Sequence, residues 1–440
     1  MKAKRLGLRI GATLLFLCLT LIALFSFTSC SAGSDEILSK DELRANINTE
    51  KTYDYVWEYL DEWNYPTFDS SRLKEVEYTF KTKYYEALPS TATLASSTAN
   101  AFLDGYYEGI DLYSSDAVTD ALIRCYVKSV GDKYATYRTQ GEYSDYKSET
   151  SGTIVGIGVN VSSTRDGDAI AVNYPLTGSP AEAAGILAGD LILAVDGATV
   201  AEHGYETVVN RISGEIGTYV TLTVKRGDES FDVRVLRAMV NLRSVDYFIT
   251  DGIGYISISS FKSNTYPQFK EAIDYMKANG ARGIIYDLRG NLGGYLNTVT
   301  DMIEYLAPRG TTVVSYSNNY QSPTVDDTDE CYTPPAIILT DYNTASAAEL
   351  FTAAVCDLAD MGYGRAIRVG KTTRGKGIMQ STFTLSDGSA LTMTVAYYNP
   401  PSGNNFHGVG LAPHVEVENS ATRDLQLERA YAEINNLINN

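Results

Sequence analysis

Residues that could bind a transition metal or form a disulfide framework are scarce in this chain of 440 residues, which has five cysteines and three histidines. The cysteines lie far apart, with no CxxC pair and no histidine nearby, so their spacing predicts neither a zinc site nor a set of disulfides. One disulfide stays open as an alternative, and Cys125 and Cys356 are expected to be small, buried, apolar side chains. No metal, nucleotide or other cofactor is implied.

Positive charge is also in short supply. The sequence has 36 Lys and Arg against 54 Asp and Glu, which gives a formal net charge of −18. A surface of this sign repels nucleic acid and anionic lipid, so we exclude nucleic acid as a partner. With 44% hydrophobic residues the chain can bury sizeable cores, and its length predicts two or three domains.

The first 30 residues have the features of an export signal. Residues 2–9 are basic, residues 10–28 are almost wholly apolar or small, and the segment ends at Cys30. Small residues directly before Cys30 resemble a lipoprotein signal, in which this cysteine is lipidated and becomes the N-terminus. Cleavage without a lipid and an uncleaved membrane span are the alternatives. We expect a membrane-anchored lipoprotein of the cell envelope, on the periplasmic or cell-surface side.

Periodicity divides the rest of the chain into three segments. Residues 31–150 begin as a polar tether and continue with helical periodicity, which predicts a helical N-terminal domain. Residues 151–240 place short β-branched runs between Gly, Asp and Asn turns, which predicts a small domain rich in strands. Residues 241–440 alternate strands and helices, which predicts an α/β core with a mostly parallel sheet. The expected fold class is a multidomain α+β protein.

Ser346 lies where a predicted hydrophobic strand, residues 335–339, leads into a predicted helix, residues 345–358. A serine at such a turn exposes its hydroxyl at the C-terminal edge of the sheet. The free N–H groups and the dipole of the helix N-terminus would also favour a developing oxyanion. Ser346 is therefore a candidate nucleophile, and the alternative is that it only caps the helix.

Lys376 stands between two glycines, Gly375 and Gly377. Glycines allow close backbone packing, and a lysine buried in this way has a lowered pKa and can act as a general base. A serine nucleophile needs such a base. A phosphate-binding loop is the alternative, but the spacing of a P-loop is not met.

Histidine offers the competing mechanism. A Ser-His-Asp triad would need His203, His407 or His414 beside Ser346. An isolated loop histidine is more often structural or solvated, so we favour Lys376 as the base.

A glycine-rich turn, residues 287–294, follows a predicted buried strand. Such a turn can direct backbone N–H groups at a substrate carbonyl. It can equally be a tight connection without a chemical role, in which Asp287 only orients the turn.

Together these three segments resemble the carboxyl-terminal processing (tail-specific) peptidases, a family of Ser/Lys serine proteases. The matching segments are the nucleophile motif, a Gly-Lys-Gly motif with a Gln four residues after its Lys, the glycine-rich turn and two late segments, at residues 344–349, 375–380, 287–294, 401–403 and 410–413. The resemblance implies Ser346 as nucleophile, Lys376 as base and Gln380 as the group that orients the lysine. It also implies an oxyanion hole from the turn at Gly293 and Gly294 and from the N–H of Ala347.

The chain departs from the family pattern at two positions. Ala348 replaces a serine of the nucleophile motif, and Leu292 replaces a proline of the glycine-rich turn. Neither change removes a reacting group.

The middle segment resembles the PDZ domain that these peptidases insert. The residues that match the loop for a peptide's terminal carboxylate are Gly156, Ile157, Gly158 and Val159. Such domains bind the peptide as an added strand and hold its last apolar side chain in a pocket. The alternative is a spacer domain without a ligand.

The sequence thus predicts an exported, membrane-anchored serine endopeptidase that cleaves proteins or peptides selected by their C-terminal end. Its expected partners are such substrates and, through the lipid anchor, the membrane; a homo-oligomer is compatible with the sequence. A catalytically inactive protein of the same fold, which only binds C-termini, is the main alternative. A metal-dependent hydrolase is the third interpretation, but the sequence has no cluster of metal ligands that would support it.

Overall fold

A computed structural model describes residues 69–105, 114–317 and 321–439 of the chain. The predicted export signal and Cys30 lie outside the described residues. Within those residues, no helix combines the length and the apolar character needed to cross a membrane. The chain forms two compact units. Among the described residues, the first comprises those up to Gly141 together with Gln380–Thr394, and the second comprises those from Glu142 to Met379 together with those from Val395 onward.

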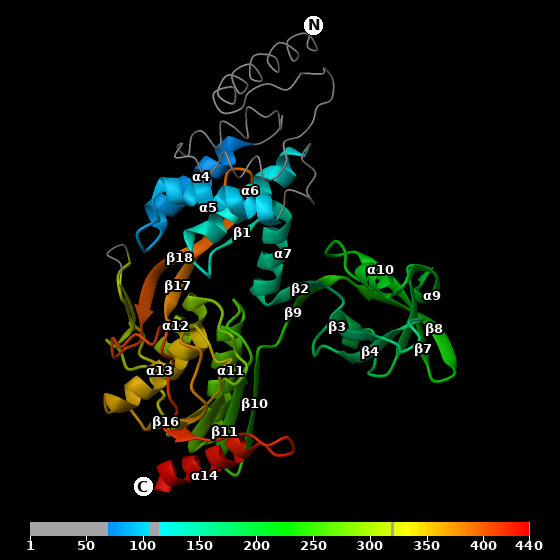
Figure 1. Cartoon of the computed structure of the whole chain (residues 1–440). Helices are drawn as coiled ribbons and strands as arrows, with labels where there is room; N and C mark the ends of the chain where they lie inside the picture. Colours follow the sequence, from blue (N-terminus) through cyan, green and yellow to red (C-terminus); the bar gives the residue numbers. More distant parts are fainter. Residues whose placement is uncertain (1–68, 106–113, 318–320, 440) are drawn as a thin grey trace, which may run out of the picture. The chain divides into compact units, whose positions relative to one another are not determined.

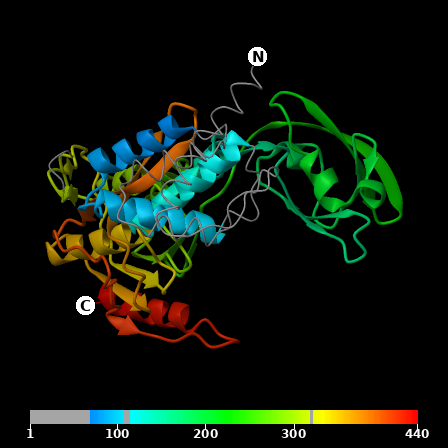
Figure 2. The ribbon, with the colours of Figure 1, turned by 45° about the horizontal axis from the view of Figure 1, so that its top comes forward.

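The first unit is mainly helical, as its periodicity predicts. Figure 2 shows its three helices in blue to cyan, and their contacts place α6 against both of the others. They are α4 (Ser70–Lys83), α5 (Thr91–Gly105) and α6 (Ser115–Val130). Side chains cap two of the helix N-termini, because Asp69 accepts from the N–H of Ser71 and Ser114 from that of Ala117. Gly131, with φ of 90°, ends α6 in the left-handed conformation.

A segment far away in the sequence completes this unit. Strand β1 (Thr136–Arg138) pairs antiparallel with the first residues of β18 (Ala390–Asn399), which follows β17 (Ile378–Thr384). The turn between β17 and β18 is tied to α4, since Ser386 N–H donates to Glu75 at 3.0 Å and Arg72 forms an ion pair with Asp387 at 2.6 Å. The predicted division at residue 240 did not anticipate that part of the last segment belongs with the helices.

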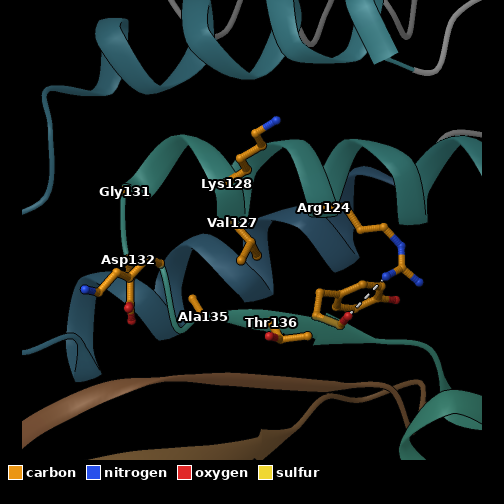
Figure 3. Close-up of a pocket in the computed structure, with 9 residues that line it drawn as sticks. Arg124, Val127, Lys128, Gly131, Asp132, Ala135 and Thr136 are labelled. Atoms are coloured by element: carbon orange, nitrogen blue, oxygen red, sulfur yellow. Dashed lines mark hydrogen bonds between the residues drawn. The ribbon is translucent and has the colours of Figure 1, made fainter. Parts of the chain in front are cut away.

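The first unit also holds a cavity of about 490 Å³ between α6 and β1 (Figure 3). Basic side chains from α6 and its C-terminal turn, Arg124, Lys128 and Lys133, are among those that line it. The Arg124 guanidinium donates to the carbonyl of Tyr137 at 3.3 Å. The lining contains none of the residues that the sequence predicts for chemistry.

A small antiparallel sheet forms the middle of the chain, as the sequence predicts. Its strands are ordered β3-β4-β5-β7-β8, with β6 paired to β5. They are β3 (Val159–Ser163), β4 (Ile170–Pro175), β5 (Leu191–Val195), β6 (Ala198–Thr199), β7 (Tyr219–Arg226) and β8 (Glu229–Leu236). Three short helices accompany them, α8 (Pro180–Ala183), α9 (Val200–His203) and α10 (Tyr205–Asn210). Because β3 is the last strand on its side, one of its edges stays open among the described strands.

A two-stranded ribbon carries the chain into and out of this domain. It pairs β2 (Thr153–Gly156), which follows α7 (Gln140–Ser151), with β9 (Ala238–Asn241). At its base, Leu242 N–H donates to the carbonyl of Gly152 at 2.8 Å. Asn264 binds both strands of the ribbon at this base, since its Nδ2 donates to the carbonyl of Gly152 at 2.7 Å and to the carbonyl of Leu242 at 3.1 Å.

The last part of the chain is built on a six-stranded sheet, ordered β10-β11-β12-β15-β16-β19. Its strands are β10 (Val245–Thr250), β11 (Ile253–Ile258), β12 (Gly283–Asp287), β15 (Ala336–Thr340), β16 (Ala366–Gly370) and β19 (Val415–Glu416). All neighbours are parallel except β10 and β11. Every residue of β12 and of β15 is buried, which explains why both strands are apolar up to their last residues, Asp287 and Thr340.

Helices cover both faces of this sheet (Figure 1). Helices α11 (Thr265–Ala278), α12 (Leu296–Glu304) and α13 (Ala347–Asp360) share the larger core with one face. Helix α14 (Leu425–Asn439) packs on the other face through Ala430 and Ile434. Strands β13 (Thr312–Tyr316) and β14 (Thr324–Val325) pair with each other, and β13 also pairs with the end of β18. The predicted fold class, a helical region, a PDZ-like sheet and a mostly parallel core, is confirmed.

Phe351 on α13 provides a test of this core. Its side chain is fully buried, and its ring centre lies 5.2 Å from that of Tyr286 and 5.7 Å from that of Phe269. We expect Phe351→Ala to lower the free energy of unfolding of the core by about 3–5 kcal/mol through lost burial and a residual cavity. Denaturant titration followed by tyrosine fluorescence measures the loss. Phe248→Ala, at a ring that is 47% exposed, is the control and should cost less than half as much; equal losses would contradict the assignment of the core.

Candidate active site

Ser346 lies at the C-terminal end of the parallel sheet, six residues after the end of β15 and directly before α13. Its backbone has φ of 58° and ψ of −120°, whereas an ordinary N-cap residue adopts the extended region. A positive φ in a residue other than glycine costs about 1–3 kcal/mol and is concentrated at functional sites. A strained serine at a strand-to-helix turn is the geometry of a nucleophile elbow. The conformation therefore argues against a serine that only caps the helix.

The turn before Ser346 is fixed by buried polar groups. The Thr344 hydroxyl donates to the carbonyl of Leu288 at 2.9 Å, and Asp341 N–H donates to that hydroxyl at 3.0 Å. Ala345 N–H donates to the carbonyl of Asn291 at 2.9 Å. These bonds join the serine turn to the glycine-rich turn that follows β12.

The buried carboxylate of Glu349 joins the serine to the lysine loop. This side chain, in the first turn of α13, is fully buried and accepts four hydrogen bonds. The donors are Ser346 N–H at 2.8 Å, the Thr373 hydroxyl at 2.5 Å, Gly375 N–H at 2.6 Å and Lys376 N–H at 2.8 Å. One carboxylate thus sets the spacing between the backbones of Ser346 and Lys376. Sequence reasoning included Glu349 in a motif without giving it a role, although its place three residues after Ser346 is that of a capping box.

The loop that carries Lys376 is closely packed, as glycines on both sides of the lysine predict. A Cβ added at Gly375 would lie 2.8 Å from the backbone N of Gly410. The carbonyl of Lys376 accepts from the Tyr398 hydroxyl at 2.9 Å, and its side chain is half-buried. Gln380 lies on β17 in the other compact unit, where its Nε2 donates to the carbonyl of Tyr134 at 2.6 Å.

The glycine-rich turn contacts the serine directly. A Cβ added at Gly293 would lie 2.8 Å from the Cβ of Ser346 and 3.0 Å from the backbone N of Ala347. Only glycine fits such an approach at φ of 100°. The three predicted oxyanion residues are therefore brought together, Gly293 in contact with Ser346 and Ala347, and Gly294 next to it in the chain.

The three predicted N–H donors are not equivalent. The N–H of Gly293 donates to the Asn291 Oδ1 at 2.8 Å and is therefore occupied. Among the described residues, no acceptor is bonded to the N–H of Gly294 or of Ala347. In this structure Gly293 N–H holds the turn, and the N–H groups of Gly294 and Ala347 have no acceptor among the described residues.

Behind this turn, an ion-pair network anchors the end of β12. Arg289 forms ion pairs with Asp287 at 2.5 Å and with Asp424 at 2.7 Å, and the Tyr255 hydroxyl donates to Asp287 at 2.7 Å. The hydrogen bond from the Arg289 guanidinium lowers the pKa of Asp424. Through Arg289, Asp287 at the end of β12 is therefore linked to Asp424, in the segment before α14.

The three histidines have other neighbours in the part of the chain that the structure describes. His203 belongs to α9 in the middle domain, and the Nδ1 of His414 accepts from Arg368 N–H at 2.9 Å. Burial and the charge of Arg368 lower the pKa of His414. The ring of His407 packs against that of Tyr397 with centres 5.4 Å apart.

The predicted carboxylate loop of the middle domain lies between β2 and β3. Gly158 has φ of 73°, and a Cβ there would lie 2.4 Å from the Cβ of Ser179, so glycine is required. The carbonyls of Ile157 and Gly158 accept from Ala181 and Leu176, at 2.8 Å and 2.9 Å. Within the described part of the chain, the N–H groups of Ile157 and Gly158 have no acceptor. The loop thus offers two adjacent donors beside the open edge of β3.

Comparison with known protein families identifies two matching regions in the chain. Residues 252–417 match the profile of Peptidase family S41, and residues 172–226 match that of a PDZ domain. Residues 252–417 therefore resemble an S41 peptidase domain. The matched ranges lie within the predicted segments 241–440 and 151–240, and the predicted resemblance to processing peptidases is confirmed.

Two curated relatives are both named probable CtpA-like serine proteases. A probable CtpA-like serine protease of Staphylococcus epidermidis (strain ATCC 12228 / FDA PCI 1200) is 34% identical over 318 residues, 71% of this chain and 63% of that protein. One of Staphylococcus aureus (strain N315) is 33% identical over 326 residues, 73% of this chain and 64% of that protein. The chain thus spans slightly under two thirds of these relatives' length. A solved photosystem II D1 C-terminal processing protease is 24% identical, with a TM-score of 0.46, over 80% of this chain and 94% of that one.

Glu349→Gln tests the carboxylate that links the two loops of the S41-like domain. A carboxamide has one acceptor oxygen, and its NH₂ group would face N–H donors, so buried N–H groups lose their partners. We expect the free energy of unfolding to fall by about 1–3 kcal/mol, with faster amide exchange at Gly375 and Lys376. The matched control is Glu416→Gln, which removes an exposed ion pair with Lys371 and should change neither quantity. An unchanged exchange rate in Glu349→Gln would refute the link.

Proposed function

We propose that this chain is an exported, membrane-anchored serine endopeptidase that cleaves proteins or peptides selected by their C-terminal end. The observation that carries the proposal is the Glu349 carboxylate, which holds a strained serine and a glycine-flanked lysine on one buried group. A binding protein without catalysis would have no need of this arrangement.

The mechanism follows from the residues around Ser346. Lys376, as a neutral amine, takes the proton of the Ser346 hydroxyl, and Oγ attacks the scissile carbonyl carbon. The carbonyl oxygen becomes an oxyanion that accepts from the N–H groups of Gly294 and Ala347, at the positive end of α13. The lysine returns its proton to the leaving amine, and water hydrolyses the acyl-enzyme. Gln380 would orient the lysine.

The PDZ domain supports selection of substrates by their C-terminus. The free N–H groups of Ile157 and Gly158 suit a terminal carboxylate, and the open edge of β3 can accept an added strand. Val159 and Val161 of β3, with Tyr205 and Val209 of α10, are partly buried against the domain core and leave apolar surface for the last side chain.

The dyad is tested with an unfolded reporter protein that ends in apolar residues. We expect Ser346→Ala and Lys376→Ala each to lower kcat/KM by at least about a thousandfold, because removing either group removes nucleophilic attack. Lys371→Ala is the matched control, since Lys371 lies in the same loop but forms ion pairs at the surface. Equal cleavage by parent and Ser346→Ala would exclude Ser346. Binding without cleavage by every variant would favour the catalytically inactive alternative.

The PDZ loop is tested by Gly158→Ala. The added Cβ overlaps Ser179, so the loop must shift and its affinity for a peptide with an apolar free C-terminus should fall at least tenfold in fluorescence anisotropy. Gly167→Ala is the control, because Gly167 has the same φ of 73° but open space around its Cα. A parent that binds the free-acid and C-terminally amidated peptides equally would argue against the carboxylate site.

The membrane anchor is supported by the sequence of residues 1–30. Cys30→Ser should abolish incorporation of labelled palmitate and release the protein from the membrane fraction into the soluble one, since several acyl chains hold a protein firmly on a membrane. Retention of the variant in the membrane fraction would instead favour an uncleaved span.

A further inference from the structure

The glycine-rich turn depends on a buried amide that the proposed mechanism does not use. Asn291 is fully buried. Its Nδ2 donates to the carbonyl of Ile258, at the end of β11, at 2.7 Å, and its Oδ1 accepts from Gly293 N–H at 2.8 Å. The Ile258 carbonyl can only accept and the Gly293 N–H can only donate, so the orientation of the carboxamide is fixed by its neighbours.

The backbone of Asn291 reaches the nucleophile as well. Its carbonyl accepts from Ala345 N–H at 2.9 Å, one residue before Ser346. A single residue therefore connects the end of β11, the glycine-rich turn and the serine turn. Proline in place of Leu292 is not needed for rigidity, because the Asn291 side chain and the contacts of Phe261 hold the turn.

Phe261 determines which N–H group stays free. Phe261 N–H donates to the carbonyl of Gly293 at 2.9 Å, and Tyr295 N–H donates to the carbonyl of Phe261 at 2.7 Å. Gly294 thus forms an isolated parallel bridge with Phe261. Successive N–H groups of an extended segment point to opposite sides, so the N–H of Gly294 points away from Phe261.

We propose that Asn291 is the positioning residue of the oxyanion hole: by binding Gly293 N–H it fixes the turn so that Gly294, with Ala347, supplies the two donors. This inference rests on the proposed function, since it assigns a role within the same reaction. Leu292, between Asn291 and Gly293, has no part in holding the turn, and its side chain is 60% exposed.

The experiment compares Asn291→Asp with Asn291→Leu in the full chain. Both substitutions keep the branched, four-atom shape of the asparagine side chain, but only aspartate keeps an acceptor for Gly293 N–H. If the acceptor matters, Asn291→Leu should lower kcat by about 10- to 100-fold with little change in KM, within the range that loss of an oxyanion donor produces. Asn291→Asp should keep more of kcat than Asn291→Leu. The inhibition constant of a peptide boronic acid, which forms a tetrahedral adduct, should rise in parallel with the loss in kcat.

A merely structural role predicts no loss of kcat per folded molecule in either variant. Asn291→Leu would then retain kcat per folded molecule, and the boronic acid would bind both variants as tightly as the parent; that result would overturn the proposal. Asn279→Leu, at the exposed end of α11, is the control and should behave as the parent.

Amide exchange separates this proposal from the proposed function. Gly293 N–H should be protected in the parent and exposed in Asn291→Leu, while the N–H of Gly294 exchanges freely in both. If the parent fails to cleave, or cleaves equally as Ser346→Ala, the proposed function fails and the exchange result still decides whether Asn291 holds the turn. If cleavage depends on Ser346 but Gly293 is unprotected in the parent, only the role of Asn291 is refuted.

Discussion

One buried carboxylate sets the spacing between Ser346 and the loop that carries Lys376. The Glu349 side chain accepts from three backbone N–H groups and a hydroxyl, and these four hydrogen bonds compensate the cost of burying its polar oxygens away from water. Its donors come from two loops that are separated by α13 and β16. Because the group accepts from both Ser346 and Lys376, the strained conformation of Ser346 is held by the same bonds that fix the lysine loop.

The site could be predicted from the sequence where its chemistry is carried by residue type and spacing. Ser346 and Lys376 stay predictions as nucleophile and base, and the structure adds that Glu349 joins their backbones. What spacing could not show is which N–H groups have partners. Gly293 and Gly294 are equivalent in the sequence, but only the fold places the Asn291 carboxamide against one of them and Phe261 beside the other. The occupied donor at Gly293 is therefore a tertiary property.

The same distinction applies to the fold. Strand β15 is apolar up to Thr340, because helices cover the sheet on both sides, and its predicted range of residues 335–339 is close to its observed bounds. The segment Gln380–Thr394 was assigned to the last domain by its position in the chain. Its place in the helical unit depends on contacts across some 300 residues of sequence, such as Ser386 with Glu75, which no local pattern contains.

The ribbon of β2 and β9 has a consequence for how such a chain can change over evolution. The entry and exit of the PDZ domain meet at Gly152 and Leu242, which are hydrogen-bonded to each other and to Asn264. A gene segment that encodes residues 153–241 could thus be lost or exchanged by recombination, with only a short turn needed to reconnect the chain. The six-stranded core would keep its strand order, while the inserted domain was lost or exchanged as a unit.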